Sequence, residues 1–109
     1  MQDMNKAVVA GNLTRDPDLR YTPNNKAVCN FTIASNYKYK DREETTFIDV
    51  VAWGGAAETI SQFLSKGNKI LVDGRLKMDK WEGKNGEKRT RIKINMEKFQ
   101  FMDLNNSGS

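Results

Sequence analysis

The sequence predicts a single all-β domain, a five-stranded barrel with one helix between the third and fourth strands. Apolar and polar residues alternate with a period of two in several segments, as half-buried strands require. Only one stretch, near the middle of the chain, has apolar residues at helical spacing. The length of 109 residues leaves room for one domain, and 38% hydrophobic residues with a net charge of +4 favour a folded chain.

The first half of the chain contains three predicted strands. They cover Asn5–Leu13, Ala27–Ser35 and Thr45–Trp53. Gly11 inside the first strand indicates a bulge or a sharp bend. Leu19–Tyr21 leads into a turn over Thr22–Asn25, where a proline and two asparagines gather. We expect the charged segment Tyr37–Glu44 to form a hairpin loop.

The second half begins with the helix. A Gly-Gly pair ends the third strand, and apolar residues at helical spacing then predict a helix over Ala56–Ser65, capped by Gly67. Two strands follow, Lys69–Trp81 and Lys88–Met96, joined by a turn over Glu82–Glu87. Their apolar residues are expected to face the core: Ile70, Val72, Leu76, Met78, Ile92, Ile94 and Met96. This order of elements is that of the OB fold, a Greek-key barrel whose closure also protects its strand edges.

Positive charge is concentrated in one segment. Residues 75–93 contain eight basic and three acidic side chains, a net +5, which leaves the rest of the chain at −1. Such a patch attracts a polyanion, and nucleic acid is the first candidate. A hairpin that lysines merely keep soluble would have the same composition.

Composition excludes several functional classes. The chain has no histidine, which removes Ser-His and Cys-His catalysis and histidine metal ligands. Its single cysteine, Cys29, cannot form an internal disulfide and indicates a reducing compartment, the cytoplasm. No apolar run could cross a bilayer, and the N-terminus lacks a signal-peptide pattern. Asp49, Asp73 and Asp79 are too scattered for a metal or catalytic cluster, so we expect a binding protein without cofactor or metal, not an enzyme.

Aromatic residues fall on the polar side of the predicted strands. The alternation that directs aliphatic residues inward directs Phe47, Trp53 and Trp81 outward, and Tyr37 and Tyr39 lie among lysines. Packing under a loop, under the helix or against a second subunit would explain any one of them. The bases of single-stranded nucleic acid explain the whole set, because each base offers a face to stack on while lysine and arginine follow the phosphates.

A series of short motifs runs through the chain in a fixed order. They are Asn12-Leu13, Asp16-Pro17, Arg20-Tyr21, Pro23-Asn24, Ala27-Val28, Asn30, Phe47–Trp53 with Gly54, Lys66-Gly67, Val72 with Gly74, and Lys80-Trp81. Together they resemble the bacterial single-stranded DNA-binding protein family over residues 4–102. We take that range as the domain and expect residues 103–109 to be a flexible end.

The resemblance implies an OB fold that assembles as a homotetramer and wraps single-stranded DNA without sequence preference. The stacking residues it implies are Tyr39, Phe47, Trp53 and Trp81, with Tyr37 as an alternative to Tyr39. The phosphate contacts it implies are Lys6, Arg20, Lys66, Lys77 and Lys80, with Asn5 as a further backbone contact. The basic segment adds Arg75, Lys84, Lys88, Arg89 and Arg91 as expected phosphate contacts.

Two departures from the family pattern bear on partners. Ile48 replaces a histidine that many members have in the subunit interface, so tetramer contacts are expected to be repacked. The family's acidic C-terminal tail has no counterpart here, which leaves tail-mediated replication and repair partners unpredicted. An OB-fold primosomal replication-restart protein, which binds single strands and replication proteins, remains the alternative. A buried Trp81 would favour it. A third possibility is an oligomeric barrel whose aromatic residues join subunits.

Overall fold

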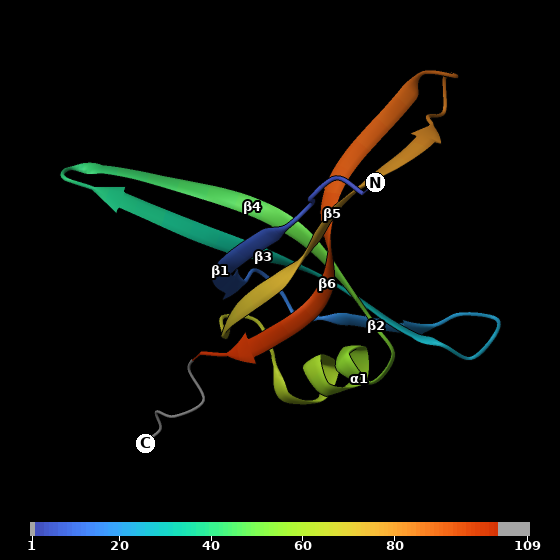
Figure 1. Ribbon diagram of the computed structural model, residues 1–109, viewed down its shortest axis with the longest axis horizontal. Helices are drawn as coiled ribbons and strands as arrows, with labels where there is room; N and C mark the ends of the chain where they lie inside the picture. The colour runs from blue at the N-terminus through green and yellow to red at the C-terminus, as the bar shows by residue number, and fades with distance from the viewer. Residues whose placement is uncertain (1, 103–109) are drawn as a thin grey trace.

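Over its described residues, the protein is a small β-barrel with one helix and two long projecting hairpins (Figure 1). The computed structural model describes residues 2–102. Its elements are β1 (Ala7–Leu13), β2 (Asp18–Tyr21), β3 (Ala27–Tyr39), β4 (Arg42–Trp53), α1 (Gly54–Phe63), β5 (Lys69–Glu82) and β6 (Lys88–Phe101). The predicted OB-fold barrel is confirmed. The expected flexible end, 103–109, lies outside the described residues.

One mixed sheet closes on itself through the first strand. The strand order is β1-β5-β6-β4-β3-β2, and β1 pairs a second time, with β3. Gly11 pairs with Ile70 of β5. A Cβ atom at Gly11 would lie 2.5 Å from the carbonyl oxygen of Ala34 in β3. The absence of a side chain at Gly11 therefore lets β3 approach β1 closely, next to the residues where β1 pairs with β3 as well as β5.

The strand count differs from the prediction. Asp18–Tyr21 forms a short sixth strand along β3, so α1 lies between the fourth and fifth strands rather than the third and fourth. Four residues are too few for a period-two pattern to stand out, and the pairing partner decides their conformation.

The predicted loop over Tyr37–Glu44 is also wrong. Its residues continue the β3–β4 ladder to Tyr39↔Arg42, and only Lys40 and Asp41 form the turn. Lys40 has a left-handed φ of 55°, as a tight two-residue hairpin turn requires. Charged side chains did not prevent pairing, since an exposed hairpin can keep them in water on both faces.

The helix begins two residues earlier than expected. It starts at Gly54, directly after Trp53, and ends at Phe63, with Leu64 as its C-cap. Gly67 therefore does not cap the helix. It forms the following turn at φ 95°, and its amide donates to the Leu13 carbonyl at the end of β1.

The core lies inside the barrel and is sealed by the helix. Its largest fully buried side chains include Phe31, Ile33, Ile60, Ile70 and Ile94. Cys29 is fully buried among them.

Three predicted core residues lie outside the barrel. Leu76, Met78 and Ile92 are about half exposed, with Ile92 at 57%. Their side chains lie on the same face of the β5–β6 pair as the buried Ile94, because Leu76 lies directly opposite Ile94 and Met78 lies directly opposite Ile92. Their strands, however, continue past the barrel into a free hairpin, so no core remains for these side chains to enter.

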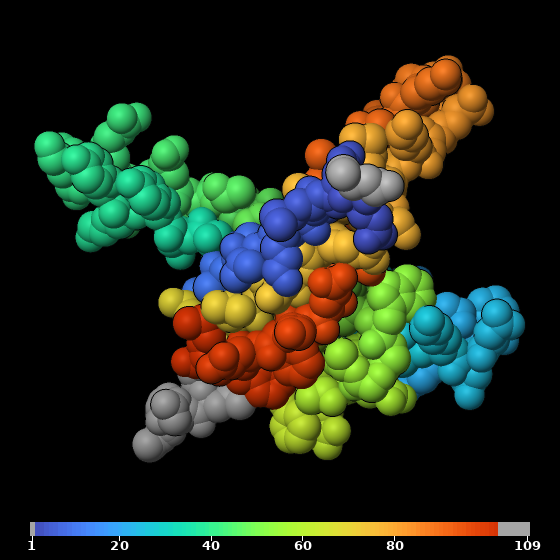
Figure 2. Space-filling view, viewed as in Figure 1, coloured from blue at the N-terminus to red at the C-terminus, as the bar shows by residue number. Residues whose placement is uncertain are grey.

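Two arms result from these long strands. The β3–β4 arm ends at the Lys40–Asp41 turn, and the β5–β6 arm ends near Gly86. Figure 2 shows both arms standing clear of the barrel body and pointing in different directions. Parallel pairing joins β4 to β6 only at Val50↔Ile94 and Val51↔Asn95, after which the two arms separate.

Candidate nucleic-acid interface

The β5–β6 arm has one polar face and one mainly apolar face. Residues directly opposite each other in an antiparallel pair share a face, and every second residue along a strand does so as well. The register therefore assigns one face to Arg75, Lys77, Asp79, Trp81, Arg89, Arg91, Lys93 and Asn95. We call this the basic face. Leu76, Met78 and Ile92 occupy the other face, together with Lys80 and Lys88 toward the tip.

The basic face continues onto the outer side of β3 and β4. The outer residues of this sheet are Asn30, Thr32, Phe47, Asp49, Val51 and Trp53. Two contacts connect the surfaces. Arg91 pairs with Asp49 at 3.4 Å, and the Trp53 indole N–H donates to the Asn95 side-chain oxygen at 3.2 Å. Phe47, Trp53 and Trp81 thus belong to one continuous surface that also contains most of the basic residues of segment 75–93.

Trp53 is held in place on this surface. It is the last residue of β4, and its extended backbone leads directly into α1. Asn95 accepts from its indole nitrogen, and the Lys26 ammonium lies 5.3 Å from the ring centroid, within cation–π range. The side chain is 39% exposed, so the ring has surface available for a planar ligand.

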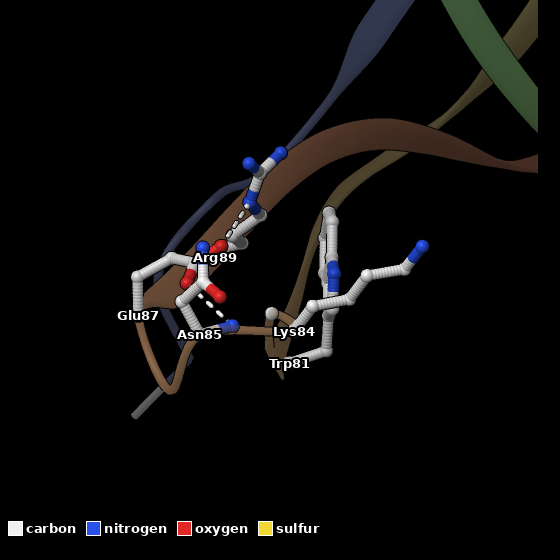
Figure 3. Close-up of a pocket in the computed structure, with 6 residues that line it drawn as sticks. Trp81, Lys84, Asn85, Glu87 and Arg89 are labelled. Carbon is white, nitrogen blue, oxygen red and sulfur yellow. Dashed lines mark hydrogen bonds and ion pairs between the residues drawn. The ribbon is translucent and has the colours of Figure 1, made fainter.

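Trp81 lies near the tip of the arm. It is 45% exposed and lines a hollow of about 370 Å³ together with residues of the turn. In Figure 3, Trp81 and Lys84 project side by side. The Glu87 carboxylate accepts hydrogen bonds from the Arg89 side chain and from the backbone N–H of Asn85. The exposure of Trp81 matches the expectation from strand alternation.

The structure does not bring all predicted stacking residues together. Phe47 is 66% exposed and faces outward with Ala34, its partner in β3. Tyr37 and Tyr39 are exposed as well, but by register they lie on the opposite face of the β3–β4 arm. The Lys40 ammonium lies 5.4 Å from the Tyr39 ring centroid.

The predicted phosphate contacts are similarly divided. Arg75, Lys77, Arg89 and Arg91 lie on the basic face. Lys80 and Lys88 lie on the other face of the arm, and Lys84 lies in its turn. Arg20 shares the outer face with Trp53, because Val28 lies directly opposite both residues.

The remaining predicted contacts, Lys6, Lys66 and Asn5, are not among the residues of the basic face. The side chains of Lys6 and Asn5 already make contacts within the chain. Lys6 pairs with Asp73 at 2.6 Å, and this hydrogen-bonded carboxylate raises the pKa of the Lys6 ammonium. Lys66 lies in the loop after α1, where its backbone amide donates to Asp16. Asn5 uses both side-chain amide atoms on the Leu76 backbone, which continues the pairing of β1 with β5.

Sequence reasoning missed the residues that hold the surface together. Nothing in the local sequence indicates the role of Asn95, because its indole partner is 42 residues away in the sequence. Lys26 was missed because a turn lysine carries no distinguishing signal. Lys93 belongs to the basic segment, yet its 2.7 Å pair with Asp79 appears only in the folded structure.

Neither a metal cluster nor a membrane span was found in the described part of the chain. Within residues 2–102, no three of the histidine, cysteine, aspartate and glutamate side chains are grouped as metal ligands would be. The one helix over these residues is too short and too polar to cross a bilayer.

An OB-fold barrel with aromatic and basic side chains on one exposed surface has the architecture of single-strand nucleic-acid binders. The chain belongs to the single-strand binding protein family, whose model matches residues 4–102. Its family is one of binding proteins rather than catalysts.

Individual relatives agree with this family membership. A single-stranded DNA-binding protein of Helicobacter hepaticus is 43% identical over 109 residues, covering 95% of this chain and 64% of that protein. One from Bacillus cereus is 40% identical over 108 residues, covering 96% of this chain and 64% of the relative. One from Paenarthrobacter aurescens is 45% identical over 98 residues, covering 84% and 57%. The chain spans less than two thirds of the length of these relatives.

Proposed function

We propose that the chain binds single-stranded DNA without sequence preference, by stacking bases on exposed aromatic rings and neutralising phosphates with lysine and arginine. The observation that carries the proposal is the continuous surface that contains Phe47, Trp53 and Trp81 together with the basic face. Each stacked base contributes about 1–3 kcal/mol, whichever base it is. Duplex DNA is a poor ligand for such a surface because its bases are already stacked on one another.

The proposed contacts fall on both sides of the two arms. Phe47, Trp53 and Trp81 stack bases on the outer surface, with Arg75, Lys77, Arg89 and Arg91 at the phosphates. Tyr37 and Tyr39 provide rings on the opposite face of one arm, and Lys80, Lys84 and Lys88 provide charge on the opposite face and turn of the other. A strand that reaches both sets passes around the arms, which supports wrapping rather than binding in a straight groove.

The biological role that follows is protection of single strands in replication, recombination and repair. Covered strands neither re-anneal nor reach nucleases. We infer that the protein acts in the cytoplasm, where bacterial or phage-encoded proteins meet such DNA. A buried Trp81 would have favoured the primosomal restart alternative, whereas the exposure of Trp81 favours the single-strand binder. The similarity to single-stranded DNA-binding proteins favours it too.

We also propose that the chain self-associates, as a homotetramer. The supporting observation is the apolar face of the β5–β6 arm, where Leu76, Met78 and Ile92 are about half exposed side by side. Apolar clusters of this kind are typical of subunit contacts. Sedimentation of the wild type and of Met78→Lys tests it: the variant is expected to dissociate, and an unchanged mass would place the subunit contact elsewhere.

Tryptophan fluorescence tests the DNA-binding proposal directly. Trp53 and Trp81 are the two tryptophans in the chain, and both are proposed to stack on bases. We expect strong quenching on titration with oligo(dT) and little with a duplex of equal length. No quenching by either ligand, with the protein shown to be folded, would contradict the proposal.

A further inference from the structure

A charged cleft lies where the β5–β6 arm leaves the barrel. It has a volume of about 210 Å³ and is lined by Asn30 and Thr32 of β3, Asp49 of β4, and Asp79, Arg91 and Lys93 of the arm. The cleft lies between Trp53 and Trp81 along the continuous surface, because Asp49 and Trp53 share the outer side of β4 while Arg91 and Trp81 share the basic face. A strand stacked on both rings would run past it.

The cations of this cleft are paired with carboxylates of the same chain. Lys93 contacts Asp79 at 2.7 Å, and Arg91 contacts Asp49 at 3.4 Å. The second Asp49 oxygen accepts a 2.8 Å hydrogen bond from the Thr32 hydroxyl. The hydrogen bond from Lys93 holds the pKa of Asp79 below its usual range, so this carboxylate is ionised at neutral pH.

These ion pairs are partly exposed to water. The arginine and aspartate of one pair are 64% and 35% exposed, and pairs in such positions are weakly held. A backbone phosphodiester carries the same single charge as a carboxylate and also offers two acceptor oxygens, so it can replace a carboxylate at a guanidinium or ammonium group. Arg15 also lines the cleft and has no ion-pair partner within residues 2–102.

We propose that this cleft is a phosphate site. Asp49 and Asp79 pair with its cations until backbone phosphates of a single strand displace the two carboxylates. The carboxylates act as internal competitors that weaken binding and make the strand easier to release. The inference rests on the proposed function and adds to it Arg15 and Lys93 as phosphate contacts. It also reverses the expected sign of a substitution, since removing the carboxylate of an ion pair at the site should strengthen binding rather than weaken it.

The opposite role for the carboxylates is structural. If Asp49 and Asp79 position the cations for DNA, their removal releases the side chains and weakens binding. The two roles therefore predict opposite changes in affinity.

The test compares Asp49→Asn, Asp79→Asn and the double variant in the full chain, with a labelled oligo(dT) of fixed length and a series of salt concentrations. Asparagine keeps an oxygen that can accept from Thr32, so the fold should persist, and the urea midpoint checks this. Glu58→Gln is the matched control. It changes the charge equally, on α1, and retains the acceptor for the Tyr21 hydroxyl.

We expect the double variant to bind about five- to tenfold more tightly at about 50 mM salt, with each freed cation steepening the salt dependence of log K by about 0.7. Glu58→Gln should alter neither quantity appreciably. Unchanged or weaker binding by the double variant, or tighter binding with no change in slope, overturns the inference.

The outcomes also separate this inference from the proposed function. If the wild type binds oligo(dT) and the variants bind no better, only the inference fails. If the wild type does not bind but the double variant does, the carboxylates block the site completely, which supports the inference. If neither binds, both proposals fail.

Discussion

Trp53 shows how one side chain is prepared for a ligand. A freely rotating indole would lose conformational entropy on stacking, whereas one held by Asn95 has already lost part of it. The Lys26 ammonium near the ring adds positive charge next to the place where a base would lie. The positioning thus depends on two residues that contribute no stacking surface themselves.

Asn95→Ala should therefore weaken binding although the ring remains. A hydrogen bond of this kind contributes about 0.5–1.5 kcal/mol, so we expect up to about a tenfold loss of affinity for oligo(dT). In a Trp81→Phe background, the emission of Trp53 reports its surroundings and should change in the unliganded protein. Gln62→Ala, which removes an exposed amide from α1, is the control. Identical emission and affinity in the Asn95 variant would contradict a positioning role.

Cys29 provides a probe of the core at the same scale. Burial raises the pKa of its thiol from 9.0 to about 11. Because the folded pKa is higher than the unfolded one, this group's contribution to stability is complete below about pH 9 and is lost as pH rises toward 11. We expect the urea midpoint to fall across that window more in the wild type than in Cys29→Ala, which lacks the thiol and keeps every other titrating group. Parallel curves would show that the pKa of the thiol is the same in the folded and unfolded states, contrary to this prediction.

At the scale of elements, close approach between strands determines where the barrel ends and the arm begins. Gly74 of β5 lies opposite Met96, next to a register shift that leaves Glu97 of β6 without an opposite residue in β5. A Cβ atom at Gly74 would overlap the carbonyl oxygen of Asn95. The bulge changes which residues of β6 face inward, from Met96 before it to Phe99 after it.

Gly74→Ala should accordingly destabilise the barrel by about 1–3 kcal/mol, the usual cost of overpacking a closely packed site. Gly55→Ala is the matched change, because a Cβ atom there meets open space at the start of α1. It should leave stability unchanged or slightly increased. Urea denaturation of both variants measures the difference, and equal midpoints would mean that β6 moves aside without cost.

At the scale of the whole molecule, stacking and charge are expected to be separable. Trp53→Ala removes a stacking surface and should cost about 1–3 kcal/mol of binding free energy with little change in salt dependence. Lys77→Gln removes a phosphate contact and should flatten the slope of log K against log salt by about 0.7. Titrations with oligo(dT) at several salt concentrations give both quantities. The division of roles is wrong if the two variants show the same slope and the same loss.

Local patterns in the chain were sufficient for the fold class and for much of the surface. Period-two alternation identified the core strands around Phe31 and Ile70, and the same alternation directed Trp81 outward, as the structure has it. Both inferences succeed because each depends on the two faces of a single strand, which the residues of that strand report directly.

Tertiary structure decided what depends on several strands at once. Whether Leu76, Met78 and Ile92 enter a core depends on where the barrel ends, and that point is set by Gly74 against Asn95 on a different strand. The opposite faces of Tyr39 and Phe47 follow from the register of β3 with β4. The Asp49–Arg91 pair arises where β4 and β6, which are distant in sequence, meet. The Asp79–Lys93 pair joins β5 and β6 diagonally across the arm. Contacts between strands depend on register and closure, which alternation along a single strand does not encode.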